Sequence, residues 1–394
     1  MATKNSKRRS RVEKIYSKGP LIIFIFCLGS IIILAFFHSL IQPNSAISPP
    51  VYEETHLISS DLNNGIGRID NAIYESLYQR GISEKNIRFL EVKPKYERGY
   101  GWDFTELLIK LPKRNLVQQV DKIISFELSQ LKTTVSWKRV SISKRELVYH
   151  IFALGFYTHK IRLICEEYQK KPHQELPKIA IIIDDLGYDH DIAVSFGQLD
   201  LPLSLSVLPL APYTKSIVNE AKKRGCELIL HLPMEPKNYP YLDPGPGALL
   251  TKMSEKEIRK TIGDHLKRIS GVRGVNNHMG SYFTEREDKM AIVLDELRKR
   301  NLFFIDSRTT SQTVAFELAK KMGVPVANRS VFLDNNLSPK AIKFQMERLL
   351  SIARHLGAAV GIGHPYKETL MILKSYLHKL KTDFEVVHVS ELTS

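Results

Sequence analysis

The carboxy-terminal part of the chain contains several runs of apolar residues, each ending on side chains that can bind a metal or move a proton. A continuous hydrophobic run is typical of a strand buried on both faces, as in a parallel sheet covered by helices. The carboxyl ends of such strands meet at one edge, where active sites form. The five endings therefore predict one shared site. The runs are Ile179–Asp185, Cys226–Pro236, Gly274–Ser281, Leu302–Thr309 and Ala358–Pro365.

Segments with helical periodicity alternate with these strands, and further strand-like runs begin near residues 203, 324 and 384. Ser254 and Thr284 are the expected N-caps of two helices, because Glu257 and Glu287 follow at the capping-box spacing. Seven or eight strand–helix units in about 215 residues predict an α/β barrel over residues 176–394. The expected helices are Thr214–Arg224, Ser254–Ile269, Glu285–Arg300, Gln312–Met322, Pro339–His355 and Lys367–Leu380.

Residues 56–170 show a different mixture, which predicts a small α+β domain. Amphipathic helices are expected at Leu62–Arg80 and Leu116–Leu131, and the polar segment Glu167–Pro177 is expected to be a hinge. No catalytic constellation stands out here, so we interpret the domain as a spacer or as a docking module for an envelope protein partner. The expected strands are Phe89–Val92, Phe104–Leu111, Val135–Val140, Glu146–Phe152 and Lys160–Cys165.

The segment Leu21–Leu40 is almost uninterrupted apolar sequence, and a helix of that length spans the hydrocarbon core of a bilayer. Residues 1–20 contain seven basic residues and one acidic residue, which by the positive-inside rule places them in the cytoplasm. We therefore predict a single-pass signal anchor in the cytoplasmic membrane, a linker at 41–55 and extracytoplasmic (periplasmic) domains beyond. The alternative is a cleaved signal peptide, but no suitable cleavage site follows the segment.

Composition narrows the class of protein further. An apolar content of 43% in 394 residues excludes general disorder and allows more than one domain. The formal charge of +15 suits work beside anionic polymers or lipid headgroups, and no nucleic-acid-binding motif accompanies it. Three cysteines are too few for a disulfide scaffold. Cys27 lies in the membrane segment, and Cys165 and Cys226 are expected to be buried thiols, with a disulfide between them as the alternative.

His231, His278 and one carboxylate of the adjacent pair Asp184 and Asp185 are the expected metal ligands, because they end three separate strands. One carboxylate and two imidazoles, completed by water, form a common first shell for zinc and related divalent cations. Asp184 precedes Asp185, and adjacent residues of an extended strand point to opposite sides. The two carboxylates are therefore expected to have different roles. The alternatives are structural: the two carboxylates could cap the following helix, and the histidines could be hydrogen-bonded residues of the core.

The remaining strand ends supply candidates for proton transfer and for substrate contacts. Asp306 and Arg308 could both face the cavity, where they would orient a base or hold a substrate oxygen, or they could simply form a salt bridge. His364 follows Gly361 and Gly363 and suits protonation of a leaving group. It could also merely cap its strand. The second-rank candidates for substrate or outer contacts are Glu235, Asn276, Asn277 and Ser281.

The ordered motifs DDLG, HLPMEP, NNHMGS, DSRT and GHP resemble the divergent polysaccharide deacetylase family, a remote branch of the NodB-homology carbohydrate esterases. The resemblance covers roughly residues 178–392. It implies a distorted (β/α)7-type barrel, a zinc-like metal centre and deacetylation of N-acetylated sugars. It also implies roles for individual residues. These are Asp184 as base, Asp185, His231 and His278 as metal ligands, Asp306 and Arg308 as the pair that orients the base, and His364 as general acid.

One feature departs from the better-studied esterases, which take both metal histidines from a single H-x3-H helix. Here the two histidines come from separate strand ends. The predicted activity is metal-assisted hydrolysis of an acetamide on peptidoglycan or a related envelope glycan. Two alternatives stay open at this stage. One is a catalytically degenerate barrel that binds glycan or an envelope protein, and the other is a metal-dependent hydrolase acting on a phosphoester or a peptide amide.

Overall fold

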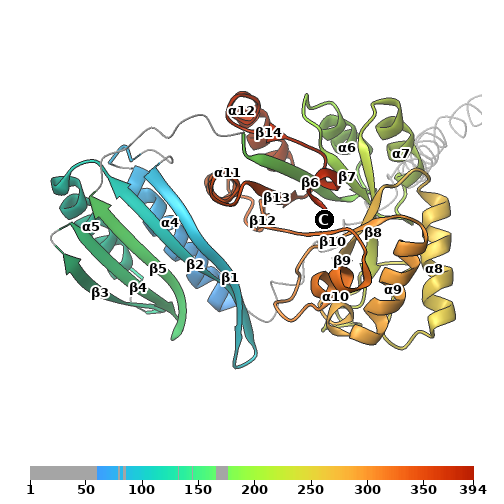
Figure 1. Cartoon of the computed structure of the whole chain (residues 1–394), viewed down its shortest axis with the longest axis horizontal. Helices are drawn as coiled ribbons and strands as arrows, with labels where there is room; N and C mark the ends of the chain where they lie inside the picture. Colours follow the sequence, from blue (N-terminus) through green and yellow to red (C-terminus); the bar gives the residue numbers. More distant parts are fainter. Residues whose placement is uncertain (1–59, 79, 83–85, 132, 144, 166–175) are drawn as a thin grey trace, which may run out of the picture. The chain divides into compact units, whose positions relative to one another are not determined.

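The computed structural model describes residues 60–394, apart from residues 79, 83–85, 132, 144 and 166–175 (Figure 1). The predicted membrane anchor, the basic tail, the linker and Cys27 lie outside the described residues. Within the described ranges, no helix has both the length and the apolar character needed to cross a bilayer. Cys165 and Cys226 are free thiols rather than a disulfide, but both are half-buried, whereas the sequence predicted buried thiols.

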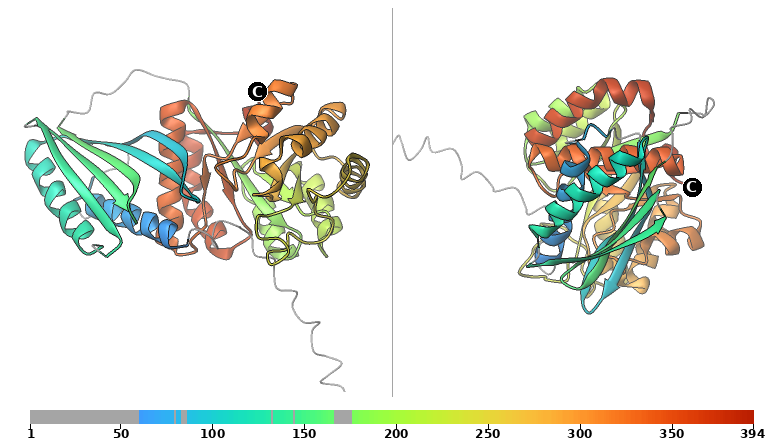
Figure 2. Two further views of the ribbon diagram at one scale, coloured as in Figure 1. Left: turned by 90° about the horizontal axis from the view of Figure 1, so that it is seen from below. Right: turned by 90° about the vertical axis from the view of Figure 1, so that its left-hand side faces the viewer.

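The described residues up to 165 form a five-stranded sheet with two helices on one of its faces (Figure 2). The strand order is β1-β2-β5-β4-β3, with β2 and β5 parallel and the other neighbours antiparallel. Each helix and strand expected in this part is present, because apolar positions follow the helical and strand periods closely. The elements are α4 Ser60–Tyr78, β1 Ile87–Glu97, β2 Tyr100–Leu111, α5 Arg114–Ser129, β3 Val135–Ser143, β4 Glu146–Ala153 and β5 Phe156–Cys165.

Residues 178–394 form an α/β fold around a curled, nine-stranded parallel sheet, in which β14 pairs β6 beside the main path β11-β10-β9-β8-β7-β6-β13-β12. This confirms the predicted α/β class, but the expected barrel is a curled half-barrel: within the described residues its end strands, β11 and β12, do not pair with each other. The strands are β6 Lys178–Leu186, β7 Ser204–Val207, β8 Glu227–Met234, β9 Gly274–Met279, β10 Phe303–Asp306, β11 Val326–Asn328, β12 Val331–Phe332, β13 Ala358–Gly363 and β14 Glu385–Val386.

Helices pack on the outer face of this sheet (Figure 1). They are α6 His190–Gly197, α7 Thr214–Lys223, α8 Glu255–Arg268, α9 Glu287–Lys299, α10 Ala315–Met322, α11 Pro339–Leu356 and α12 Lys367–Asp383, with the 3-10 turns η2 Phe283–Glu285 and η3 Val389–Leu392. The helix α6 was not predicted from the sequence. Its N-cap is Asp189, whose side chain accepts hydrogen bonds from the amides of Asp191 and Ile192. The two-residue strand β12 was not predicted either.

Both faces of the strands are buried, as the uninterrupted apolar runs predict. Ile182 and Ile229 belong to a cluster on the inner face of the curl. Ile181 and Leu230 belong to the larger cluster formed with the helices. Alternate residues of these strands therefore pack into the two clusters on opposite faces of the sheet. Both faces are mainly apolar, and the polar side chains gather towards the strand ends.

The two predicted capping boxes have different outcomes. Ser254 caps α8, accepting from the amide of Glu257, while the Glu257 carboxylate accepts from the amide of Ser254. The Thr284 prediction is wrong, because α9 begins after Arg286. Thr284 is buried in η2, where its hydroxyl donates to the carbonyl of Gly280 and so fixes the turn after β9.

Candidate metal centre

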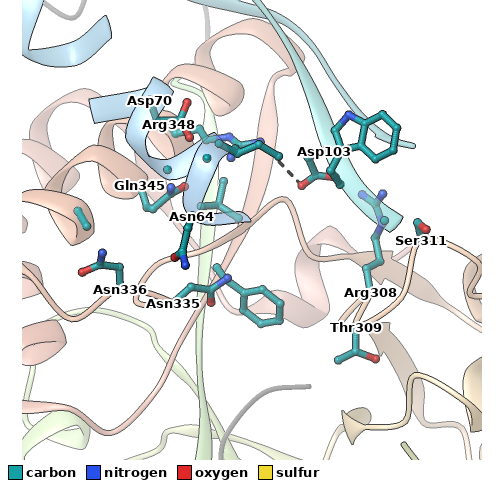
Figure 3. Close-up of a pocket in the computed structure, with 18 of the residues that line it drawn as sticks. Asn64, Asp70, Asp103, Arg308, Thr309, Ser311, Asn335, Asn336, Gln345 and Arg348 are labelled. Atoms are coloured by element: carbon teal, nitrogen blue, oxygen red, sulfur yellow. Dashed lines mark ion pairs between the residues drawn. The ribbon is translucent and has the colours of Figure 1, made fainter. Parts of the chain in front are cut away.

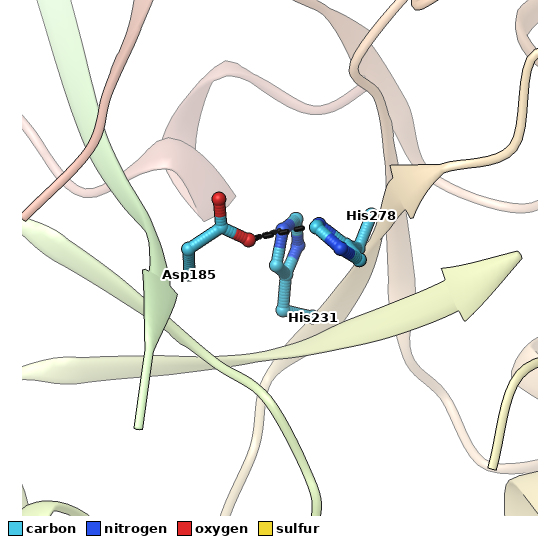
Figure 4. Close-up of side chains that lie close together, drawn as sticks. All are labelled: Asp185, His231 and His278. Atoms are coloured by element: carbon cyan, nitrogen blue, oxygen red, sulfur yellow. Dashed lines mark ion pairs between the residues drawn. The ribbon is translucent and has the colours of Figure 1, made fainter. Parts of the chain in front are cut away.

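Three buried side chains from separate strand ends meet at the carboxyl edge of the curled sheet (Figure 4). Asp185 is in β6, His231 in β8 and His278 in β9. Nε2 of His231 and Nδ1 of His278 each lie 2.8 Å from Oδ1 of Asp185. One ligand atom from each residue falls within 4.8 Å of the other two. Residues separated by up to 93 positions in the sequence, Asp185 to His278, therefore share one site.

The backbone at the strand ends has an unusual conformation that helps to gather these side chains. Asp185 (φ 56°), Met279 (φ 52°) and Arg308 (φ 51°) are non-glycine residues in the left-handed region, at the ends of β6, β9 and β10. Each costs roughly 1–3 kcal/mol, and such strain is concentrated at functional sites. At Asp185 it breaks the strand alternation. Asp184 and Asp185 consequently both face the site, although adjacent residues of a regular strand would diverge.

The three side chains fit a bound divalent cation. Among the described residues, neither carboxylate oxygen of Asp185 has a hydrogen-bond partner, and neither does Nε2 of His278, although all three atoms are buried. The imidazole nitrogens approach Asp185 without hydrogen-bond alignment. Buried polar atoms are normally satisfied, so a group of unsatisfied ones needs an explanation such as an ion. One carboxylate and two imidazoles are a donor set suited to zinc.

Asn276, in β9, connects one ligand to the candidate base. Its Oδ1 accepts from Nδ1 of His231 at 2.9 Å and from the hydroxyl of Ser206 at 2.7 Å. Its Nδ2 donates to both oxygens of Asp184, at 2.8 and 3.0 Å. Because Nδ1 of His231 carries the proton in this arrangement, its Nε2 lone pair remains for a metal. The same amide side chain holds the Asp184 carboxylate in place.

Charge stabilises this buried group in the absence of a cation. Burial opposes ionisation of Asp185, but the positive charge of His278 and His231 offsets it and holds the pKa of that carboxyl well below its usual range. Burial likewise disfavours the charged form of His231, but the carboxylates of Asp184 and Asp185 offset it and raise its pKa. Attraction between the carboxylates and His231 therefore favours the charged forms of Asp185 and His231 despite their burial.

His364 approaches the same group from the end of β13. Its Nε2 lies 3.8 Å from Oδ2 of Asp185, and its Nδ1 lies 2.7 Å from Oδ1 of Asp334. The other Asp334 oxygen accepts from the amide of His364 and from the hydroxyl of Thr369. Asp334 is almost fully buried. It holds the imidazole through Nδ1, so that Nε2 is the ring nitrogen nearer to Asp185.

Comparison with known proteins agrees with this geometry. A model of the family described as divergent polysaccharide deacetylase matches residues 181–393. The chain belongs to this family.

Two relatives of this divergent deacetylase-family chain are described as uncharacterised proteins. A protein from Haemophilus influenzae is 32% identical over 215 residues, which are 55% of this chain and 76% of that protein. YibQ from Escherichia coli is 34% identical over 215 residues, 55% of this chain and 67% of YibQ. The crystal structure of a protein from Agrobacterium tumefaciens is 25% identical, with a TM-score of 0.53, and the match covers 57% of this chain and 92% of that one.

The divergent deacetylase fold places Asp306 and Arg308 differently from the pair implied by the resemblance. The carboxylate of Asp306 accepts from the backbone amide of Arg308 and from the hydroxyl of Thr313, whereas the described hydrogen bonds to the Asp184 carboxylate come from Asn276. Burial raises the pKa of this carboxyl despite these hydrogen bonds. Asn276, rather than Asp306 and Arg308, makes the contacts that orient Asp184. The left-handed backbone at Arg308 breaks the extended geometry that would have put both side chains on one face.

The three expected substrate contacts mostly support the loops around the site. Glu235 accepts a hydrogen bond from the amide of Thr251 through its carboxylate. Asn277 accepts from the amide of Ser307 and donates to the carbonyl of Met279. Ser281, at the pocket wall, accepts from the amide of Lys237. These contacts explain how the loops are fixed, and a substrate role for the three residues stays a prediction.

Two site residues were underestimated or missed by the sequence analysis. Asn276 was placed in the second rank, although the alternation along NNHM puts it on the same face as His278. Asp334 was not considered, because it follows the two-residue strand β12, which has too few residues to show a period. The only local signal was the sequence LDNN after an apolar pair, which also suits an ordinary turn.

Replacing Asn276 by alanine is expected to weaken metal binding by roughly tenfold to a hundredfold, because the partner that fixes His231 is lost. It also leaves buried atoms of Asp184 and Ser206 without a partner, so the free energy of unfolding should fall by about 2–4 kcal/mol. Competition with a chromophoric chelator measures the first effect, and urea unfolding of metal-free protein the second. Ser206→Ala is the matched control and should keep its metal affinity. Equal metal affinity in the two variants would contradict this role of Asn276.

Replacing Asp334 by asparagine should lower kcat roughly a hundredfold or more and leave KM nearly unchanged, because His364 loses the carboxylate that holds its ring. Steady-state acetate release and metal content are the measurements. Thr369→Val removes a different hydrogen bond to Asp334 and serves as the control, with only a small effect. A loss in kcat that is equal in both variants would argue for a merely structural Asp334.

Metal affinity should fall as the pH falls, by about tenfold per pH unit for each proton released, because imidazole ligands must be neutral to bind. The pKa of His231 is raised above 6.5, so competition begins above that value. In metal-free protein, the raised pKa of His231 adds to the free energy of unfolding. This contribution is complete below pH 6.5 and is lost as the pH rises through the pKa of His231 in the folded protein. The lowered pKa of Asp185 also adds to the free energy of unfolding. This contribution is present above pH 3.8 and is lost as the pH falls through the pKa of Asp185 in the folded protein. Chelator competition from pH 8 to 6 checks the first claim, and an unchanged affinity would refute it.

Proposed function

We propose that this chain is a metal-dependent hydrolase that removes acetyl groups from an N-acetylated envelope polysaccharide, such as peptidoglycan. Zinc is the cation that we propose for Asp185, His231 and His278. Family membership supports the deacetylase class. The observation that supports the proposal most is that Asp184 and His364, the proposed base and acid, each lie within 4 Å of a different residue of the same buried group. Asp184 Oδ1 is 3.9 Å from His231 Nδ1, and His364 Nε2 is 3.8 Å from Asp185 Oδ2.

A divalent cation held by these ligands supplies Lewis acidity, which polarises a carbonyl and makes a water molecule easier to deprotonate. Asp184, held by Asn276, takes a proton from the water that attacks the acetyl carbon. The C–N bond then breaks, and His364 gives a proton from Nε2 to the departing sugar amine. Acetate and a free amine are the products. Asp334 keeps the His364 ring aimed at the leaving group throughout.

Location and partners follow from the sequence and form part of the proposal. The apolar segment Leu21–Leu40 would anchor the chain in the cytoplasmic membrane, with the catalytic part outside. The basic balance of the chain, +15, would favour approach to anionic envelope polymers. An envelope protein that docks on residues 56–170 is the remaining proposed partner.

The test is acetate release by purified full-length protein from tetra-N-acetylchitotetraose and from N-acetylated peptidoglycan fragments. Activity should disappear with a chelator and return on addition of zinc. A protein that binds glycan but releases no acetate with any divalent cation would favour the degenerate, binding-only alternative. Phosphate release from a phosphoester panel, without acetate release, would favour the other hydrolase class.

A further inference from the structure

Arg308 occupies a rigid position beside the candidate metal centre. The residues on either side of it are fastened to the end of β9, the strand that carries His278. The amide of Ser307 donates to Oδ1 of Asn277 at 2.9 Å, and the hydroxyl of Thr309 donates to the carbonyl of Met279 at 3.0 Å. The left-handed backbone of Arg308 directs its own amide to Asp306. The backbone at Arg308 is therefore held against the end of the strand that carries His278.

The guanidinium of Arg308 is available for an external anion. Within the described part of the chain, no carboxylate lies within ion-pair distance of it, and the oxygens of Asp306 accept from other donors. The side chain is half-buried and lines a pocket together with Thr309 and Ser311 (Figure 3). An arginine fork matches carboxylate and phosphate groups in geometry as well as in charge.

A second arginine, Arg329, lines the same pocket. Arg329 donates to the carbonyls of Ser307 at 2.7 Å and of Arg308 at 3.0 Å. Its guanidinium lies 3.7 Å from the ring centroid of Phe332. On the site side, Phe332 stacks with His364 at a centroid distance of 6.0 Å. Arg329 thus supports the segment that carries Arg308 and places a second positive charge one aromatic ring away from the proton donor.

We propose that Arg308, supported by Arg329, binds a carboxylate or phosphate on the sugar unit next to the one that is deacetylated. The substrate class is then an anionic N-acetylated glycan rather than a neutral one. This inference rests on the proposed function, because it assigns the substrate of the same site. It uses Arg308 for substrate selection, a role separate from the base-orienting contact that Asn276 makes.

The experiment compares three probes on full-length protein. They are tetra-N-acetylchitotetraose, which is neutral; a tetrasaccharide of alternating N-acetylglucosamine and N-acetylmuramic acid, which carries carboxylates; and an N-acetylglucosamine oligomer bearing phosphate. Wild type should prefer at least one anionic probe in kcat/KM by roughly tenfold to a hundredfold, the size of a charge-assisted hydrogen bond. Arg308→Gln should reduce that preference ratio by a similar factor, and the preference should weaken with added salt. Which anionic probe is preferred distinguishes a carboxylate source from a phosphate source.

Arg298→Gln is the matched control, because it removes one exposed arginine of α9 and should keep the wild-type ratio. Calorimetric binding of the same probes to metal-free protein provides a second readout that needs no turnover. Equal rates on all probes would overturn the inference and leave the deacetylase proposal intact. Binding that depends on Arg308 without acetate release would support the anion site and overturn the deacetylase proposal. Neither turnover nor binding that depends on Arg308 would overturn both.

Discussion

His278→Ala is expected to abolish metal binding and deacetylase activity together. The variant removes one of the three candidate ligands and leaves His231 as the one imidazole within 3 Å of the Asp185 carboxylate among the described residues. Loss of the cation removes several kcal/mol of transition-state stabilisation, and about 4 kcal/mol corresponds to a thousandfold in rate. We therefore expect kcat to fall by about a thousandfold or more, as measured by acetate release and by elemental analysis of the same sample.

A control must separate metal loss from unfolding. His265 is also a buried histidine, but its Nε2 lies 2.8 Å from the carbonyl of Gly247, and it is not one of the three ligands. His265→Ala should lower the free energy of unfolding and keep the metal. If His278→Ala kept full activity without bound metal, the hydrolytic mechanism proposed here would be wrong.

Asp184→Asn is expected to lower kcat by roughly a hundredfold to ten-thousandfold while the metal stays bound. Asparagine has nearly the same shape and retains one oxygen that can accept from Nδ2 of Asn276, so the fold should be preserved. It cannot take a proton from water. The measurements are acetate release, zinc content and the midpoint of thermal unfolding.

The distinction between base and ligand is tested by pairing this variant with Asp185→Asn. Asp185→Asn should lose the metal as well as the activity, since its buried oxygens have no hydrogen-bond partner among the described residues and are the proposed ligand atoms. If the two variants lost metal to the same extent, Asp184 would be a ligand too and the assignment of the base would have to change.

Much of the fold could be predicted from the sequence because the strands of the curled sheet are buried on both faces. Runs such as that at Ile179–Ile183 leave no polar face, and each predicted strand start from residue 179 onward corresponds to a strand or to its immediate neighbourhood. The predictions that failed have local causes. The elements α6 and β12 are too short to show a hydrophobic period. At Thr284, the capping-box spacing occurs in a turn that is fixed by a hydrogen bond to the carbonyl of Gly280.

The site could be predicted as far as residue type and strand position determine it. Asp185, His231 and His278 meet as the shared edge of the sheet requires. The supporting contacts could not be predicted, because they depend on backbone conformation. The left-handed backbone conformation of Asp185 lets both Asp184 and Asp185 face the site. The left-handed conformation of Arg308 prevents the pairing of Arg308 with Asp306 that a regular extended strand would favour. Asp334 reaches His364 from a segment 30 residues earlier, a distance that no local pattern encodes.

The most direct measurement of the central claim is an anomalous-scattering map, recorded at the zinc edge from crystals of active, zinc-loaded protein, together with its metal content. We predict one peak per chain, lying between the carboxylate of Asp185 and the imidazoles of His231 and His278, and a metal content close to one. A protein that releases acetate while this map shows no peak among those three side chains would contradict the account.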